Sequence, residues 1–224
     1  MVMNVLITGS AGGIGREIVS AFEAIGCSVL QVTRDDCDLS DATDLDRYLM
    51  SREFKVDVFV HCAGVNEPMG FESIDDSVLR RTMGVNYSSG LKILQKLLPY
   101  MRGNGFGRVV FISSLWSELG RSGRLTYSAS KAALDASMRS LAVEYAKQNI
   151  LFNSLAPGFV DTPLTRENMS QDQIELVKNK TPTAKLVGCD EIARMVVYLC
   201  GEANSSITGQ SIKIDGGYSI SGNF

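Results

Sequence analysis

The sequence predicts a doubly wound α/β fold, in which a parallel sheet carries helices on both faces. Short apolar runs rich in valine and isoleucine alternate with longer segments of helical periodicity, which is typical of a parallel sheet covered on both sides. A glycine cluster follows the first apolar run, where such folds turn from strand into helix. No internal repeat or linker divides the 224 residues, so we expect one domain over residues 1–224.

The expected strands are the short apolar runs, taken in chain order. They are Val2–Thr8, Ser28–Val32, Val56–Cys62, Arg108–Ser113, Leu151–Ala156 and Ser211–Ile214. The longer segments between them have helical periodicity, and their helices are expected to begin near Ile14, Thr43, Asp75, Tyr127 and Asp190. This βαβ alternation is the basis of the predicted fold.

The segment after the second expected strand is unusually short. Residues 33–41 leave no room for both a crossover helix and a full strand. We therefore expect a shortened crossover, in which either the third strand is vestigial or its helix is replaced by a tight loop.

Composition excludes several classes of function. A net charge of −3 offers no basic surface for nucleic acid or an anionic membrane, and no apolar run approaches the ~20 residues that span a bilayer. The N-terminus lacks the features of a signal peptide, so we expect a cytoplasmic protein. The five cysteines are scattered and His61 is the only histidine, so neither a disulfide framework, a metal site nor a Ser-His-Asp triad is expected.

The glycine cluster predicts a nucleotide site. Residues 9–15 read Gly-Ser-Ala-Gly-Gly-Ile-Gly, between an apolar strand and a helix. Glycines allow the backbone to approach a pyrophosphate closely, and a helix N-terminus offers free N–H groups and a positive dipole to the anion. The alternative, a merely flexible turn, does not explain so many glycines.

The end of the second strand is where dinucleotide folds bind the adenosine ribose. This chain has Thr33-Arg34 there, and an arginine suits a 2′-phosphate, whereas a carboxylate suits a free 2′-hydroxyl. Asp35 and Asp36 complicate the assignment, because a carboxylate turned toward the site would repel phosphate. A solvated Arg34 is the alternative; we favour NADP(H) over NAD(H).

Tyr127 and Lys131 form a candidate acid/base pair. If their alanine-rich segment is helical, these two residues share one face, and Ser113 and Ser114 lie just upstream. A free tyrosine titrates near pH ~10, and a nearby positive charge lowers that value. The pair is therefore a plausible general acid/base, although the same spacing also occurs on ordinary exposed helices.

Taken together, these motifs resemble the short-chain dehydrogenase/reductase family, in its compact single-domain branch, over nearly the whole chain. The glycine loop is similar to that family's cofactor motif, and Tyr127-x-x-x-Lys131 to its catalytic pair. Ser114 and Asn86 match the other two active-site residues. Residues 153–163 resemble its nicotinamide-side segment, and residues 209–217 resemble its last strand and tail.

The resemblance implies a Rossmann-like fold and a full set of site residues. The implied catalytic residues are Asn86, Ser114, Tyr127 and Lys131. The implied cofactor contacts are Gly9, Ser10, Gly13, Ile14, Gly15, Thr33, Arg34, Asp38, Leu39, Cys62, Ala63, Gly64, Tyr127, Lys131, Pro157, Gly158, Val160 and Thr162. No metal is implied.

Three departures from the family pattern stand out. One is the shortened crossover, which brings Asp38 and Leu39 close behind Arg34, where the resemblance implies that they cup the adenine. After the fourth strand the family often has Asn-Asn-Ala-Gly, whereas this chain has His61-Cys62-Ala63-Gly64. The small residues are kept, so cofactor binding is expected to survive, with His61 packed between strands rather than catalytic. Gly12 stands where NADP-preferring relatives often carry a basic residue, so Arg34 would bear the 2′-phosphate largely alone, with Thr33 as a possible helper.

The implied activity is hydride transfer between NADP(H) and a carbonyl or secondary alcohol, of 3-oxoacyl thioester type or a related ketone. Tyr127 would pass the proton, Ser114 would bind the reacting oxygen, and Lys131 would hold the nicotinamide ribose. Asn86 would support a water that relays protons toward Lys131. The alternatives are a retired nucleotide-binding regulator, an NAD(H)-dependent alcohol or sugar dehydrogenase, and a sugar-nucleotide epimerase or dehydratase.

Substrate identity depends on two variable stretches, residues 115–124 and 164–185, of which the second has the mixed composition of a mobile lid. Trp116 is either a wall for the substrate or interface core. Arg121 and Arg124 either meet an acidic or phosphorylated substrate or are solvated. Helices apolar on several faces, with the family resemblance, lead us to expect a homodimer or homotetramer.

Overall fold

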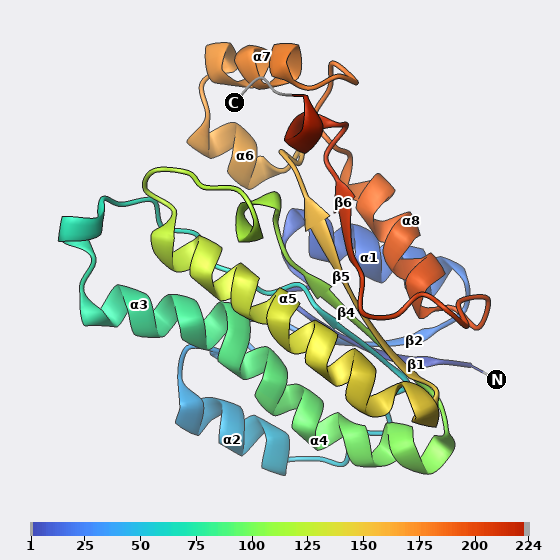
Figure 1. Cartoon of the computed structure of the whole chain (residues 1–224). Coiled ribbons are helices and arrows are strands. Elements are labelled where there is room, and N and C mark those ends of the chain that lie inside the picture. Colours follow the sequence, from blue (N-terminus) through green and yellow to red (C-terminus); the bar gives the residue numbers. More distant parts are fainter. Residues whose placement is uncertain (1, 222–224) are drawn as a thin grey trace.

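The computed structural model describes residues 2–221, and within them a six-stranded parallel sheet forms the centre of the molecule (Figure 1). Its strand order is β2-β1-β3-β4-β5-β6. The strands are β1 (Asn4–Thr8), β2 (Ser28–Val32), β3 (Val58–His61), β4 (Gly107–Ile112), β5 (Ile150–Pro157) and β6 (Ser211–Ile214). The predicted doubly wound α/β fold is confirmed.

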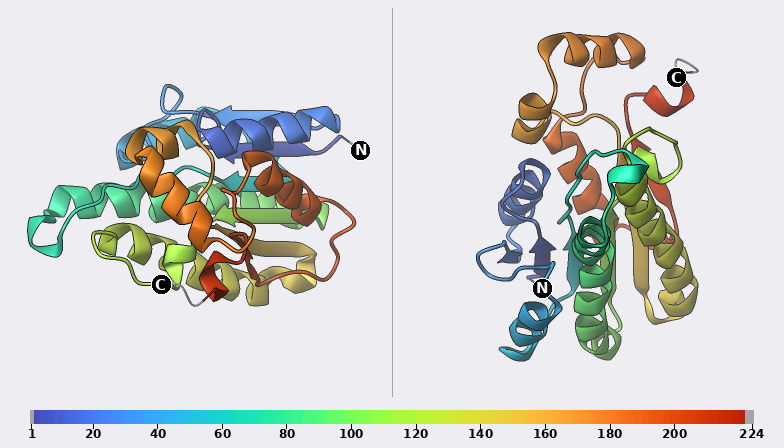
Figure 2. Two further views of the ribbon diagram at one scale, coloured as in Figure 1. Left: turned by 90° about the horizontal axis from the view of Figure 1, so that it is seen from above. Right: turned by 90° about the vertical axis from the view of Figure 1, so that its left-hand side faces the viewer.

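Helices cover both faces of the sheet, as Figure 2 shows from two further sides. One face carries α2 (Ala42–Met50), α4 (Ser89–Asn104) and α5 (Leu125–Tyr145), and the other carries α1 (Gly13–Ala24) and α8 (Cys189–Cys200). Two short helices, α6 (Pro163–Asn168) and α7 (Gln171–Lys180), lie beyond the end of β5. Within the described residues, no helix is long and apolar enough to cross a bilayer.

Two separate hydrophobic cores follow from the strand geometry. Successive side chains of a strand point to opposite faces, so Leu6 packs toward α2, α4 and α5, while Val5 and Ile7 pack toward α1 and α8. Because both faces are buried, the strands read as continuous apolar runs rather than as alternating ones.

The shortened crossover is also confirmed. Residues 33–41 contain no strand, and the Asp41 side chain caps α2 by accepting from the backbone N–H groups of Thr43 and Asp44 at 2.8 and 3.3 Å. From α2 the chain enters β3, which pairs with β1 on the side opposite β2. The sheet therefore ends at β2.

One long helix expected from residue 75 onward is divided into three parts. It consists of α3 (Asp76–Met83), a π-helical turn at Gly84–Ser88, and α4. A π-helical turn inserts an extra residue into a helix and is frequent at functional sites. Here it contains Asn86, which is fully buried.

Candidate active site

The predicted site residues gather at the carboxyl edge of the sheet. The glycine loop follows β1, Cys62–Gly64 follow β3, Ser113 and Ser114 follow β4, and Pro157 ends β5. All strands are parallel, so these ends share one edge, the upper one in Figure 1. Ligands of open α/β sheets bind at this edge.

The glycine loop is packed so tightly that side chains are excluded at two of its positions. Gly9 has a φ of +67°, and a Cβ there would lie 2.7 Å from the Ala63 backbone. A Cβ on Gly15 would lie 2.2 Å from the Gly9 carbonyl oxygen. The loop thus rests directly on the residues after β3, and α1 begins within it at Gly13.

Ser10 shows that this loop suits a phosphate. Its side chain is almost fully buried, and its Oγ has no hydrogen-bond partner within residues 2–221. Buried hydroxyls are normally satisfied, so an orphaned one beside a helix N-terminus indicates an absent acceptor. Ile14 packs into the core behind the loop.

The residues after β2 lie where the adenosine end of a cofactor is expected. Arg34 is exposed and makes no ion pair with any described residue, so its guanidinium is free for a ligand. The Asp36 carboxylate turns back to accept from the Thr33 backbone N–H and hydroxyl at 2.9 and 2.7 Å, and these bonds lower its pKa. The Thr33 hydroxyl is therefore already committed, so it does not assist Arg34 as a free donor.

Asp38 and Leu39 complete this end of the site. Asp38 accepts from the backbone N–H and hydroxyl of Ser40 at 2.9 and 2.7 Å, which lowers its pKa. Leu39 is half-buried against the core beneath α2 and α4. Both side chains are thus fixed in place behind Arg34.

Asn86 fastens the loop after β3 to the π-helical turn. Its amide oxygen accepts from the Val65 backbone N–H at 2.7 Å, and its amide nitrogen donates to the Val65 carbonyl at 2.9 Å and to the Ser130 hydroxyl at 3.0 Å. A Cβ added to Gly64 would lie 3.6 Å from the Asn86 Oδ1 and 3.4 Å from the Lys131 Nζ. Asn86, Gly64 and Lys131 therefore adjoin one another.

His61 lies fully buried between the glycine loop and Asn86. Its Nδ1 is 2.8 Å from the Thr8 hydroxyl, and its Nε2 is 3.3 Å from the Asn86 backbone oxygen. Since a carbonyl only accepts, Nε2 carries the proton and Nδ1 accepts from Thr8. Burial, aided by the charge of Lys131, lowers the pKa of His61 to about 3, so the ring is neutral. The expectation of a packing role for His61 agrees with this geometry.

Tyr127 and Lys131 both lie on α5, which confirms the helical spacing, and Ser114 lies beside them. The Lys131 Nζ is 5.7 Å from the centre of the Tyr127 ring and donates to the Ile112 carbonyl at 2.7 Å. Burial lowers the pKa of Lys131 to about 8. The Ser114 side chain hydrogen-bonds to Tyr127. The three side chains thus form one cluster.

The expectation that Lys131 lowers the pKa of Tyr127 is wrong for this structure. Burial raises the pKa of Tyr127 above its usual value, and the hydrogen bond with Ser114 and the charge of Arg124 only partly offset this rise. The ammonium of Lys131 faces the Ile112 carbonyl rather than the phenol oxygen. Sequence reasoning considered Arg124 as a contact for an acidic or phosphorylated substrate, but not as a charge that acts on Tyr127, three residues later.

The nicotinamide-side segment crosses from β5 to the glycine loop. Pro157 is buried at the end of β5, and Gly158 packs so closely on Asp215 that a Cβ would lie 2.8 Å from that side chain. Val160 is buried, and Thr162 begins α6 by accepting from the Thr165 N–H at 3.1 Å. A Cβ on Gly13 would lie 3.1 Å from the Thr162 methyl group. This segment therefore joins the two ends of the site.

Three aromatic side chains form a connected group that includes Trp116, which lies shortly after Ser114 in the chain, and sequence reasoning identified one of them. The rings of Trp116 and Phe159 meet edge to face at 6.0 Å, and those of Phe159 and Tyr218 meet at 5.3 Å. The Trp116 backbone N–H donates to the Ser114 Oγ at 3.3 Å. We call Trp116, Phe159 and Tyr218 the aromatic group.

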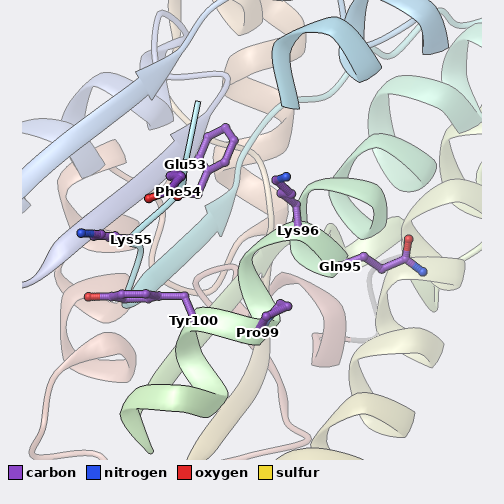
Figure 3. A pocket seen from close by; sticks show the side chains of 7 residues that line it. All are labelled: Glu53, Phe54, Lys55, Gln95, Lys96, Pro99 and Tyr100. Carbon is purple, nitrogen blue, oxygen red and sulfur yellow. The ribbon is translucent and has the colours of Figure 1, made fainter. Parts of the chain in front are cut away.

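The pocket shown in Figure 3 lies away from the candidate site. It has a volume of about 390 Å³ and is formed by residues before β3 and on α4, near the amino edge of the sheet. No predicted site residue lines it. A second hollow of about 440 Å³ touches the glycine loop at Gly13.

A parallel doubly wound sheet with an acid/base cluster beside a glycine loop defines a class of nucleotide-dependent oxidoreductases. Residues 36–219 match a family model described as enoyl-(acyl carrier protein) reductase. A 3-oxoacyl-[acyl-carrier-protein] reductase of Mycobacterium bovis is 31% identical over 96% of this chain and 92% of its own.

Solved structures agree with these sequence matches. A 3-ketoacyl-(acyl-carrier-protein) reductase from Brucella melitensis, complexed with NADH, is 26% identical with a TM-score of 0.87, covering 97% of this chain and 98% of its own. The protein ElxO with NADP bound is 25% identical with the same score of 0.87, covering 98% and 99% of the two chains. The chain belongs to the short-chain dehydrogenase/reductase family, whose members act on C=O and CH–OH groups.

Proposed function

We propose that the protein transfers a hydride between NADP(H) and a ketone or secondary alcohol, with Tyr127 as the general acid and base. The observation that carries the proposal is the cluster of Ser114, Tyr127 and Lys131 at the same sheet edge as the glycine loop. An intact cluster argues against a retired regulator. Relatives that reduce 3-oxoacyl groups support a ketone of that type or a related one.

The residues proposed to hold the cofactor come from the family resemblance and are supported by the geometry above. Ser10 and the N-terminus of α1 would bind the pyrophosphate, Arg34 the adenosine 2′-phosphate, and Lys131 the nicotinamide ribose. The preference for NADP(H) rests on Arg34, which forms no ion pair with any carboxylate in the described residues. Solved relatives bind either NADP or NADH. When bound, a nicotinamide supplies or accepts the hydride.

The chain's own groups handle the charge and the proton. As a carbonyl is reduced, negative charge develops on its oxygen, and the Tyr127 hydroxyl donates its proton there. Ser114 binds the same oxygen as a second donor. Charged Arg124 stabilises the phenolate that remains. Asn86 keeps Val65 and Ser130 in place at the side of Lys131.

We expect Tyr127→Phe to lower the rate of ketone reduction by about two to four orders of magnitude, the usual contribution of a general acid. Cofactor affinity should stay nearly unchanged, because the phenyl ring still fills the same space. The reduction rate is measured with a panel of ketones by the loss of NADPH absorbance. Cofactor affinity is measured by fluorescence titration with NADPH. Near-wild-type turnover in the variant would remove Tyr127 from the reaction.

We also propose that the protein is a homodimer or homotetramer, with α4 and α5 at a subunit interface. Val143 on α5 is 86% exposed and Leu125 is 49% exposed, which is unusual for large apolar side chains on a helix whose opposite side already fills the core.

A further inference from the structure

Arg121 and Arg124, here called the arginine pair, stand at the mouth of the candidate site without a counter-ion. Arg124 immediately precedes α5, three residues before Tyr127, and the charges of Arg124 and Tyr127 influence one another. Arg121 lies on the other side of the same turn, and its backbone oxygen accepts from the Arg124 N–H at 3.3 Å. Neither arginine forms an ion pair with a residue in the described range 2–221.

Carboxylates on the neighbouring loops are already used by other cations. Glu118 pairs with Lys213 at 2.6 Å, and Glu67 pairs with Arg81. Arg124 donates instead to the neutral side-chain oxygen of Asn66, on the loop after β3. The arginine pair is thus left as a local excess of positive charge.

The arginine pair is held in place rather than free in solvent. The Arg121 guanidinium lies over the rings of Trp116 and Phe159, at 5.0 and 5.5 Å from their centres. Arg124 is only partly exposed, and burial together with the charge of Arg121 lowers its pKa. Holding two like charges near each other is unfavourable unless an anion joins them.

We propose, on the basis of the function proposed above, that the ketone substrate carries an anionic group, a carboxylate or a phosphate, which Arg124 binds with Arg121 as the second cation. Arginine offers a planar fork of donors that fits both anions. The carbonyl would then lie at Ser114 and Tyr127, the anion at the arginine pair, and apolar parts of the substrate against the aromatic group. This narrows the ketone class to oxo acids and phosphorylated ketones.

The test compares each charged substrate with a neutral partner of nearly the same shape. The panel holds oxo acids with none, one or two methylene groups between the carbonyl and the carboxylate, their methyl esters, and phosphorylated ketones of matching length. We expect the wild-type protein to show a kcat/KM at least about tenfold higher for an oxo acid or a phosphorylated ketone than for the uncharged methyl ester of the same length. If the oxo acids give the larger ratio of kcat/KM over the ester, the bound anion is a carboxylate. If the phosphorylated ketones do, it is a phosphate.

Arg124→Gln should reduce that ratio by about tenfold or more, to a value near one, mainly through a higher KM for the charged substrate. The ratio is the informative quantity, since loss of a charge near Tyr127 would slow acid and ester alike. Arg124→Lys keeps the charge and should retain part of the ratio, and it also serves if the glutamine variant does not fold. Arg102→Gln, at the far end of α4, is the matched control and should leave the ratio unchanged.

An equal or higher kcat/KM for the esters in wild type, or an unchanged ratio in Arg124→Gln, would overturn the anionic-substrate inference while leaving ketone reduction intact. If no ketone were reduced, the proposed function would fail by itself. Isothermal titration of acids and esters into the NADPH-loaded Tyr127→Phe variant would then still decide the inference, because equal affinities overturn it without any turnover.

Discussion

At the scale of single residues, Arg34 is the side chain on which the choice between the two nicotinamide cofactors depends. We expect Arg34→Ala to raise the KM for NADPH by about 10- to 100-fold, the cost of losing a charged hydrogen bond of roughly 1.5–3 kcal/mol. The KM for NADH should change little, because that cofactor has no 2′-phosphate for the guanidinium to bind. Initial rates with each cofactor measure both values.

Arg47→Ala serves as the control for this change. Arg47 is also an exposed arginine, but it lies on α2 and pairs with Asp44 at 2.7 Å. Its replacement should alter neither KM. Equal increases for NADPH and NADH in Arg34→Ala would show that Arg34 does not contact the 2′-phosphate, and the preference for NADP(H) would be wrong.

His61 should make the stability of the protein sensitive to acid. Its pKa is about 3 when folded and about 6.5 in an unfolded chain. Between these values the unfolded state binds more protons, so the free energy of unfolding falls as pH decreases through this window. From pH 7 to pH 5 the loss should be about 2 kcal/mol, measured by urea denaturation at both pH values.

The matched variant is His61→Gln, in which an amide replaces the ring and does not titrate. Its stability should change much less between pH 7 and pH 5, since Lys131 stays charged there in both states and most carboxylates titrate lower. A proton NMR titration of the only histidine gives a second measurement. A His61 resonance that titrates near pH 6.5 in the folded protein would contradict this account.

At the scale of elements, the junction of β1 and α1 tolerates no side chain at Gly15. We expect Gly15→Ala to destabilise the protein by about 1–3 kcal/mol, the usual cost of overpacking, and to weaken cofactor binding. The reason is the 2.2 Å approach of the new Cβ to the Gly9 oxygen. In Gly12→Ala, the matched control, the nearest atom would be 3.4 Å away and the φ of −75° suits alanine. Thermal unfolding compares the two, and equal stability would disprove the clash.

The strands were predictable because a sheet buried on both faces requires apolar runs of limited length. Ser28–Val32 and Ser211–Ile214 were predicted with the observed bounds. The π-helical turn at Gly84–Ser88 was not predicted, because the hydrophobic pattern continues through it and only the backbone register changes. The stretch expected to act as a lid begins with α6 and α7, whose short amphipathic pattern was too weak to identify from sequence.

Within the candidate site, too, residues marked by a sequence pattern were predictable and residues that depend on the tertiary fold were not. Ser114, Tyr127 and Lys131 were predictable because their spacing and order along the chain carry the signal. Phe159 and the effect of the Arg124 charge on Tyr127 were not, since both depend on which loops the fold brings together. The direction of the pKa shift of Tyr127 was wrong for the same reason, because burial is a tertiary property that helical spacing does not report.

At the scale of the whole molecule, the face that carries α4 and α5 offers a surface for a second copy of the chain. We expect sedimentation at micromolar concentration to give the mass of a dimer or tetramer. Val143→Lys should shift that mass toward the monomer, because it places a charge where an apolar side chain is 86% exposed. Ile25→Lys is the control: Ile25 is 56% exposed at the end of α1, on the opposite face, and its replacement should leave the mass unchanged. A wild-type monomer would rule out the proposed assembly, and a mass unaffected by Val143→Lys would place the interface on another face.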